Sequence, residues 1–88
     1  AEGARVENSL LADGCLIEGE VTNSILFRGV HVEKGARVDH CILMQACRVG
    51  AGSQLDYVIT DKDVSISSYQ VLHGAAHYPM FLEKGSRI

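Results

Sequence analysis

Residues 23–27 read NSILF, residues 40–44 read HCILM and residues 57–61 read YVITD, so that three copies of one layout recur at a constant spacing. A fourth copy, NSLLA at positions 8–12, precedes them at a slightly shorter spacing. A constant period of this kind predicts a repeat architecture, in which each unit buries its apolar side by stacking on its neighbours. The period thus predicts how the chain is built, whereas its function needs a separate argument.

Small and apolar side chains within each unit come in pairs two residues apart, a spacing that places both on one face of a strand. The second members lie at positions 26, 32, 38, 43, 49, 55, 60, 66 and 72, in steps of six, six and five. Three short strands per unit give a triangular prism, and its narrow interior requires one small residue in each pair. The first coil is two residues short, so we expect its third side to contract in a turn at Gly19.

The handedness does not follow from this pattern alone, because crossovers between parallel strands are generally right-handed. A six-residue period, however, is typical of the left-handed hexapeptide β-helix. We therefore predict an all-β fold, a single-stranded left-handed parallel β-helix of about four coils, over residues 1–72.

Residues 73–88 leave this register. Pro79 cannot donate to a sheet ladder and belongs at a strand start or an edge. We expect a C-terminal cap here, with Phe81 or Tyr78 covering the last coil. The repeat is already in progress at residues 4–6, so we also expect a piece of a longer polypeptide.

One outward column of the predicted prism is apolar throughout, whereas the other two are mixed. β-Branched residues suit strands in general, which is the simplest explanation for such a column. A continuous exposed apolar stripe more often marks a contact with another surface. We therefore predict an interface with another domain or subunit, formed by Leu10, Ile25, Ile42 and Ile59 and flanked by Phe27 and Met44.

Composition excludes several classes of function. A formal net charge of −3 over 88 residues argues against nucleic-acid binding. The sequence contains no long apolar run and no leader segment, so we do not expect a membrane-spanning or secreted protein. The three cysteines are odd in number and form no C-x-x-C pair. We interpret Cys15, Cys41 and Cys47 as apolar fillers of a reduced, cytoplasmic protein.

Few residues are candidates for catalysis, metal binding or anion binding. A metal centre needs three converging ligands, and the positions of His31, His40, His73 and His77 predict none within one chain. A trimer could assemble a histidine site across subunits, so an enzyme remains an open alternative. Arg28, Arg48 and Lys62 could form an anion or effector patch at corners of successive coils, although no phosphate-binding glycine loop is present.

Particular strings carry a resemblance beyond the period. NSLLADGCLIEGEV (residues 8–21), NSILFRGV (23–30), ILMQ (42–45) and DKDVSI (61–66) resemble the C-terminal domain of bacterial glucose-1-phosphate adenylyltransferase, or ADP-glucose pyrophosphorylase. The tail, with Tyr78-Pro79 and residues 83–85, is similar to the closing segment of that family. The MQ and DKD strings favour the GlgD-type subunit of glycogen biosynthesis.

The resemblance implies an N-terminal nucleotidyltransferase domain, outside this chain, that joins ATP and glucose 1-phosphate into ADP-glucose and diphosphate with Mg²⁺. It places the catalytic residues and the metal in that domain, so no catalytic residue is transferred to this chain. The β-helix of the family packs on the catalytic domain, contributes to subunit contacts and takes part in control by sugar phosphates.

We therefore expect a structural, oligomerisation and regulatory domain that is inert alone. Its expected partners are its own catalytic domain and homologous subunits, including the catalytic paralogue. A free-standing trimeric hexapeptide-repeat acyltransferase is the alternative, and it predicts loss of activity on His31→Ala.

Overall fold

The computed structural model describes residues 4–88, and every regular element in that range is a β-strand. The strands form three parallel sheets, named A, B and C here. Sheet A contains β1 (Arg5–Glu7), β4 (Glu20–Thr22), β7 (Arg37–Asp39), β10 (Gln54–Asp56) and β13 (Val71–His73). Sheet B contains β2 (Leu10–Leu11), β5 (Ile25–Leu26), β8 (Ile42–Leu43), β11 (Val58–Thr60) and β14 (Met80–Leu82). Sheet C contains β3 (Leu16–Ile17), β6 (His31–Val32), β9 (Arg48–Val49) and β12 (Ser65–Ile66).

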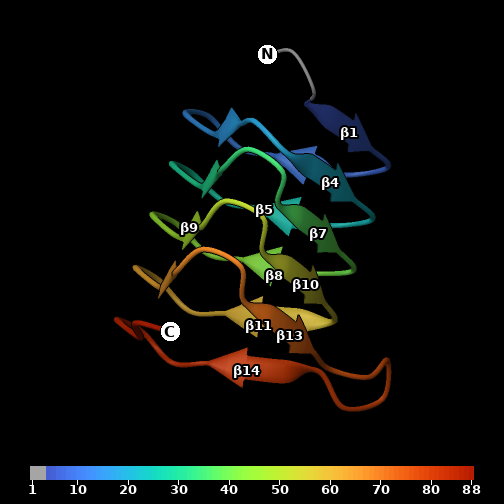
Figure 1. The fold of residues 1–88 in the computed structure, drawn as a ribbon, viewed down its shortest axis with the longest axis vertical. Helices are drawn as coiled ribbons and strands as arrows, with labels where there is room; N and C mark the ends of the chain where they lie inside the picture. The colour runs from blue at the N-terminus through green and yellow to red at the C-terminus, as the bar shows by residue number, and fades with distance from the viewer. Residues whose placement is uncertain (1–3) are drawn as a thin grey trace.

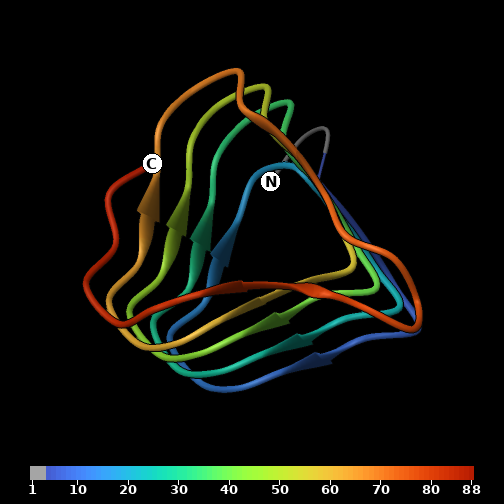
Figure 2. The ribbon, with the colours of Figure 1, turned by 90° about the horizontal axis from the view of Figure 1, so that it is seen from below.

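The chain visits the sheets in the order A, B, C and repeats, which winds it into a stack of triangular coils (Figures 1 and 2). In Figure 2, viewed from the C-terminal end, the chain runs clockwise as it approaches the viewer, which is the left-handed sense. The predicted left-handed parallel β-helix of about four coils is thus confirmed.

The interior of the prism follows the predicted pairs. The first, small members Ser24, Ala36, Cys41, Cys47 and Ser53 are all buried. Buried hydroxyls are satisfied by backbone groups, because Ser24 Oγ donates to Thr22 O at 2.7 Å and Ser53 Oγ donates to Ser67 O at 2.8 Å. The larger second members Leu26, Val32, Val38, Leu43, Val49, Leu55 and Ile66 are buried beside them. The core also includes Val21, Val30, Val58 and Val64.

Gly19 allows the short first coil to contract, for a different reason from the one expected. Its φ lies outside the left-handed region, but a Cβ at this position would lie 2.3 Å from the carbonyl oxygen of Ala36. Close backbone approach therefore requires the glycine. The contraction also places Glu20 in the outward column between Arg5 and Arg37, a position that the regular pattern leaves out.

The C-terminal segment extends the stack. A turn in which Ala75 and Tyr78 exchange backbone hydrogen bonds leads into β14, which pairs in parallel with β11. Met80 and Leu82 pack against the core, whereas Phe81 and Tyr78 are 58% and 84% exposed. The expectation that Phe81 or Tyr78 covers the last coil is therefore wrong, because the chain regains the strand register and turns Phe81 outward.

Candidate functional site

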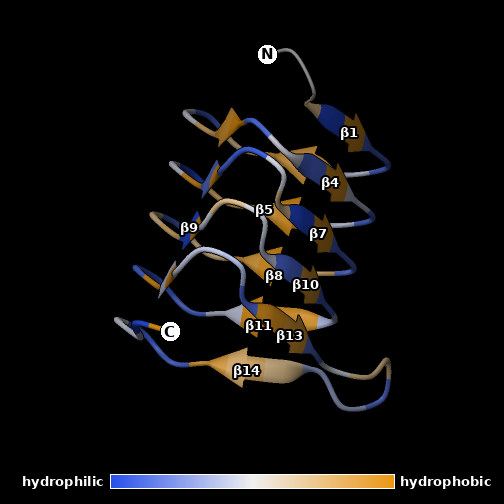
Figure 3. Cartoon of the chain, in the orientation of Figure 1, coloured by the Kyte–Doolittle hydropathy of each residue, from blue (hydrophilic) through white to orange (hydrophobic). Residues whose placement is uncertain are grey.

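The outer face of sheet B is apolar from the first coil to the last. Strand pairing places Leu10, Ile25, Ile42 and Ile59 in one column, as predicted, and adds Phe81 beside Ile59. In Figure 3 β5 and β8 are coloured hydrophobic, whereas β7 and β10 of sheet A begin hydrophilic. We call this surface the apolar wall and define it as Leu10, Ile25, Ile42, Ile59 and Phe81, with Phe27 and Met44 at its edge.

Several side chains of the apolar wall are open to solvent. Leu10 is 69% exposed, Ile25 41% and Phe27 40%, while Ile42, Ile59 and Met44 are half-buried. Fully burying one such side chain contributes about 1.5–3 kcal/mol. Burial of the whole wall by a partner would thus make a large hydrophobic contribution to the free energy of binding.

The other two walls are mixed, with polar pairs beside exposed apolar side chains such as Val71 on sheet A and Leu16 on sheet C. On sheet A, Arg37 Nε lies 3.7 Å from Glu20 Oε2. On sheet C, His31 Nε2 lies 2.8 Å from Glu18 Oε1, and Arg48 Nε donates to Glu33. That hydrogen bond from Arg48 lowers the pKa of Glu33 below its ordinary value. Sheets A and C therefore present mixed surfaces, whereas the apolar wall carries apolar side chains along its whole column.

The three basic residues of the predicted anion patch do not form one group. Arg28 and Lys62 lie at the corner between sheets B and C, and Gln45 lies between them in the stack. Hydrogen bonds between successive turns show this order: Ala46 N donates to Arg28 O, and Asp63 N donates to Gln45 O. Arg48 lies on the wall of sheet C, where it is paired with Glu33. Only Arg28 and Lys62 therefore share one corner.

The cysteines occupy the predicted interior columns. Cys41 and Cys47 are buried, Cys15 is half-buried, and all three are free. Burial raises the pKa of the Cys41 thiol to about 11, so the thiolate needed for nucleophilic or metal-binding chemistry is suppressed at neutral pH.

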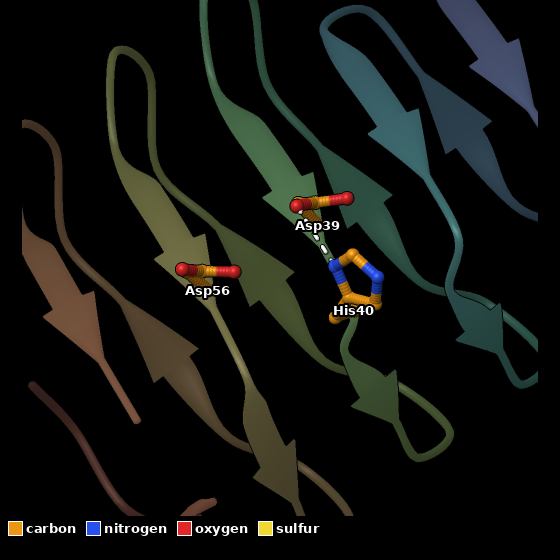
Figure 4. A group of neighbouring side chains, drawn as sticks. All are labelled: Asp39, His40 and Asp56. Carbon is orange, nitrogen blue, oxygen red and sulfur yellow. Dashed lines mark hydrogen bonds and ion pairs between the residues drawn. The ribbon is translucent and has the colours of Figure 1, made fainter. Parts of the chain in front are cut away.

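A polar cluster that the sequence analysis missed lies where sheet A turns into sheet B. Asp39 and Asp56 end β7 and β10 and are register partners. His40 follows Asp39 with a left-handed φ of 52°. One ligand atom from each of the three residues lies within 4.8 Å of the others, and Figure 4 shows the two carboxylates and the imidazole side by side. The prediction concerned the four histidines, and no three of them meet within residues 4–88; here two carboxylates lie beside one histidine.

Neighbouring side chains hold this cluster in place. Asp39 accepts hydrogen bonds from Thr22 Oγ1 at 2.7 Å and from Asn23 Nδ2 at 3.2 Å. His40 Nδ1 lies 2.9 Å from Asp39 Oδ2, and its ring stacks on Tyr57 with centroids 4.7 Å apart. Burial raises the pKa of Asp39, but the hydrogen bonds that it accepts outweigh this, so its pKa lies below the ordinary value.

The other three histidines do not belong to the cluster, although one of them lies at its edge. His73 Nδ1 lies 3.3 Å from Asp56 Oδ2 at the edge of the cluster. His31 is half-buried on the wall of sheet C, and His77 is exposed in the tail. A column search would have found the two aspartates of the cluster, because the constant period aligns Asp39 with Asp56.

Three parallel sheets, one strand of each per coil and a left-handed sense define the class of the protein as a hexapeptide-repeat β-helix. A family model described as GlmU-like, C-terminal hexapeptide matches residues 1–75. The chain belongs to this family.

Curated relatives make the similarity more specific. The glycogen biosynthesis protein GlgD of Bacillus subtilis (strain 168) is 50% identical over 80 residues, which cover 91% of this chain and 23% of that protein. The glucose-1-phosphate adenylyltransferase of Bacillus cereus (strain Q1) is 38% identical over 72 residues, covering 82% of this chain and 19% of the relative. The enzyme of the same name from Corynebacterium jeikeium (strain K411) is 36% identical over 72 residues, covering 81% and 18%.

These relatives confirm the resemblance noted in the sequence. The chain spans less than a quarter of the length of each of them. Nowhere in residues 4–88 is there a helix long and apolar enough to span a membrane.

Proposed function

We propose that this chain is the structural, oligomerisation and regulatory domain of a glucose-1-phosphate adenylyltransferase subunit of the GlgD type, acting in the cytoplasm in glycogen biosynthesis. In this proposal the rest of the subunit and its catalytic paralogue carry out the reaction of ATP with glucose 1-phosphate. The Mg²⁺ that the reaction needs belongs to that catalytic part, and no residue of this chain is assigned to it.

The observation that carries the proposal is the apolar wall. Two sides of the prism carry ion pairs of arginine with glutamate, whereas the third exposes aliphatic and aromatic side chains along its whole length. Surfaces of this kind occur where another protein surface packs. Because the relatives are more than four times as long as the matched segment, the occupant that we propose is the catalytic domain of the same subunit.

The regulatory part of the proposal concerns the corner between sheets B and C. Arg28 and Lys62 lie there two coils apart, and they are the basic residues that we propose to contact an anionic effector. Arg48 is left out of this role because it is already paired with Glu33.

A matched set of variants in the full-length subunit tests the docking role. Leu10→Asp and Ile25→Asp place a charge on the apolar wall, and Val71→Asp places the same charge on the wall of sheet A, where Val71 is 59% exposed. We expect the first two to loosen the contact with the catalytic domain of the same subunit, measured as faster limited proteolysis between the two domains, and Val71→Asp to leave the cleavage rate unchanged. Equal behaviour of all three variants would overturn the proposal.

Catalysis is tested with the chain alone. A coupled assay for diphosphate release should give no ADP-glucose synthesis above background, and activity would refute an inert domain. The alternative, a trimeric acyltransferase, predicts acyl transfer that is lost on His31→Ala. His31 is bonded to Glu18 on the wall of sheet C, and the GlgD and adenylyltransferase relatives favour the first proposal.

A further inference from the structure

We propose that Asp39, His40 and Asp56 bind one divalent transition-metal ion, of the Zn²⁺ type, at the corner between sheets A and B. We call these three residues the corner site. The proposal concerns this chain alone and is independent of the docking role of the apolar wall.

Backbone geometry brings the three ligands together. Asp39 and Asp56 end paired strands, and neighbouring strands lie about 4.8 Å apart. The left-handed conformation of His40 turns the chain sharply after Asp39, which lets consecutive residues contribute to one site. The ligands come from two successive coils, so a bound ion would link them.

One carboxylate oxygen of the corner site is left without a partner. The two carboxylates lie one strand spacing apart, with His40 Nδ1 2.9 Å from Asp39 Oδ2 and His73 Nδ1 3.3 Å from Asp56 Oδ2. Asp39 is well provided with hydrogen-bond donors. Asp56 is different, because its Oδ1 is shut off from solvent and has no hydrogen-bond partner among residues 4–88. A buried carboxylate oxygen without a donor is costly, and a bound cation would remove that cost.

The ligand set indicates which class of ion would bind. Imidazole nitrogen combined with carboxylate oxygen suits Zn²⁺ and its neighbours better than Mg²⁺ or Ca²⁺, which prefer oxygen ligands. Zinc takes such ligands at about 2.0–2.2 Å, so tetrahedral ligand atoms lie roughly 3.3 Å apart. The ligand atoms now lie within 4.8 Å of one another, and small side-chain rotations would bring them to that spacing.

Surrounding residues supply the support that metal ligands usually have. Thr22 and Asn23 fix the carboxylate of Asp39, and His73 lies against the other oxygen of Asp56. Tyr57 stacks on the ring of His40 with an interplanar angle of 13°. Such contacts orient ligands and raise metal affinity. Three protein ligands leave one tetrahedral position for water.

Titration of the metal-free full-length subunit with Co²⁺, a spectroscopic substitute for Zn²⁺, tests the proposal. His40→Gln and Asp56→Asn each remove one ligand. His77→Gln is the matched control, because His77 is an exposed histidine of the tail. Circular dichroism confirms that each variant keeps its β-structure.

We expect the unmodified protein and His77→Gln to bind one more equivalent of Co²⁺ than the other two variants, with visible absorption bands of a tetrahedral site. The affinity at that site should fall at least ~10-fold in His40→Gln and Asp56→Asn. Equal stoichiometry in all four proteins, or the same loss in His77→Gln, would overturn the proposal and leave adventitious histidine binding only.

Discussion

Phe81 lies beside Ile59 on the outer face of sheet B, in the same register that pairs Val58 with Met80 and Thr60 with Leu82. The pairing continues the apolar column of the first four coils onto β14, although the segment between β11 and β14 is longer than that between any other paired strands of this sheet. The side chain of Phe81 is 58% exposed. The apolar wall therefore runs the full length of sheet B.

Replacing Gly19 by Ala should destabilise the fold strongly. A Cβ there would lie 2.3 Å from the oxygen of Ala36 and 2.8 Å from that of Glu33, and backbone atoms cannot move aside as a flexible side chain would. We expect Gly19→Ala to reduce the free energy of unfolding by about 2–4 kcal/mol, measured by denaturant unfolding.

Gly14→Ala is the matched control for this prediction. Its φ of 78° strains any L-residue, but a Cβ there would meet its nearest atom at an ordinary 3.8 Å. The expected cost is about 1–2 kcal/mol. A smaller loss for Gly19→Ala than for Gly14→Ala would contradict the close-approach explanation.

Cys41 should resist alkylation in the folded protein. Burial raises the pKa of its thiol to about 11, so little thiolate exists at pH 8, and the side chain is only 1% exposed. Iodoacetamide labelling followed by peptide mass spectrometry should modify half-buried Cys15 first and Cys41 only after unfolding. Equal labelling rates at these two positions in the native protein would refute this account.

The ion pair of Glu33 and Arg48 should contribute stability that depends on pH. The pKa of Glu33 is lowered in the folded state, so its contribution is present above the unfolded pKa, near 4.5, and is lost as the pH falls through the lower folded value. Because Arg48 is 61% exposed, we expect an effect below about 1 kcal/mol. Thermal unfolding of Glu33→Gln should differ from that of the unmodified protein at pH 7, and the difference should shrink as the pH falls below 4.5. A difference that stayed constant below pH 4.5 would be inconsistent with this assignment.

The period predicted the interior of the molecule well, because inward side chains must recur wherever coils stack. Leu43, Val49 and Leu55 are buried in the three sheets as their spacing required. The pattern failed where the spacing changes. Glu20 stands in an outward column only because the short first coil contracts. The longer segment before β14 places Phe81 on the outer face instead of over the last coil.

The corner site could not be found from apolar periodicity, because its residues are polar and lie at the end of strands. Its geometry depends on the backbone conformation of His40, and a left-handed φ is uncommon for a residue with a side chain. The period of the sequence shows that Asp39 and Asp56 share a column. It does not show that the side chain of His40 lies beside them.

Solvent accessibility of the apolar wall in the full-length subunit tests the central claim most directly. Hydroxyl-radical footprinting reports on Leu10, Phe27 and Phe81, with the exposed side chain of Tyr69 as the reference. The account predicts that the three wall residues are strongly protected in the assembled protein while Tyr69 stays reactive. Oxidation of the wall residues at the rates expected from their exposure in this chain would contradict it.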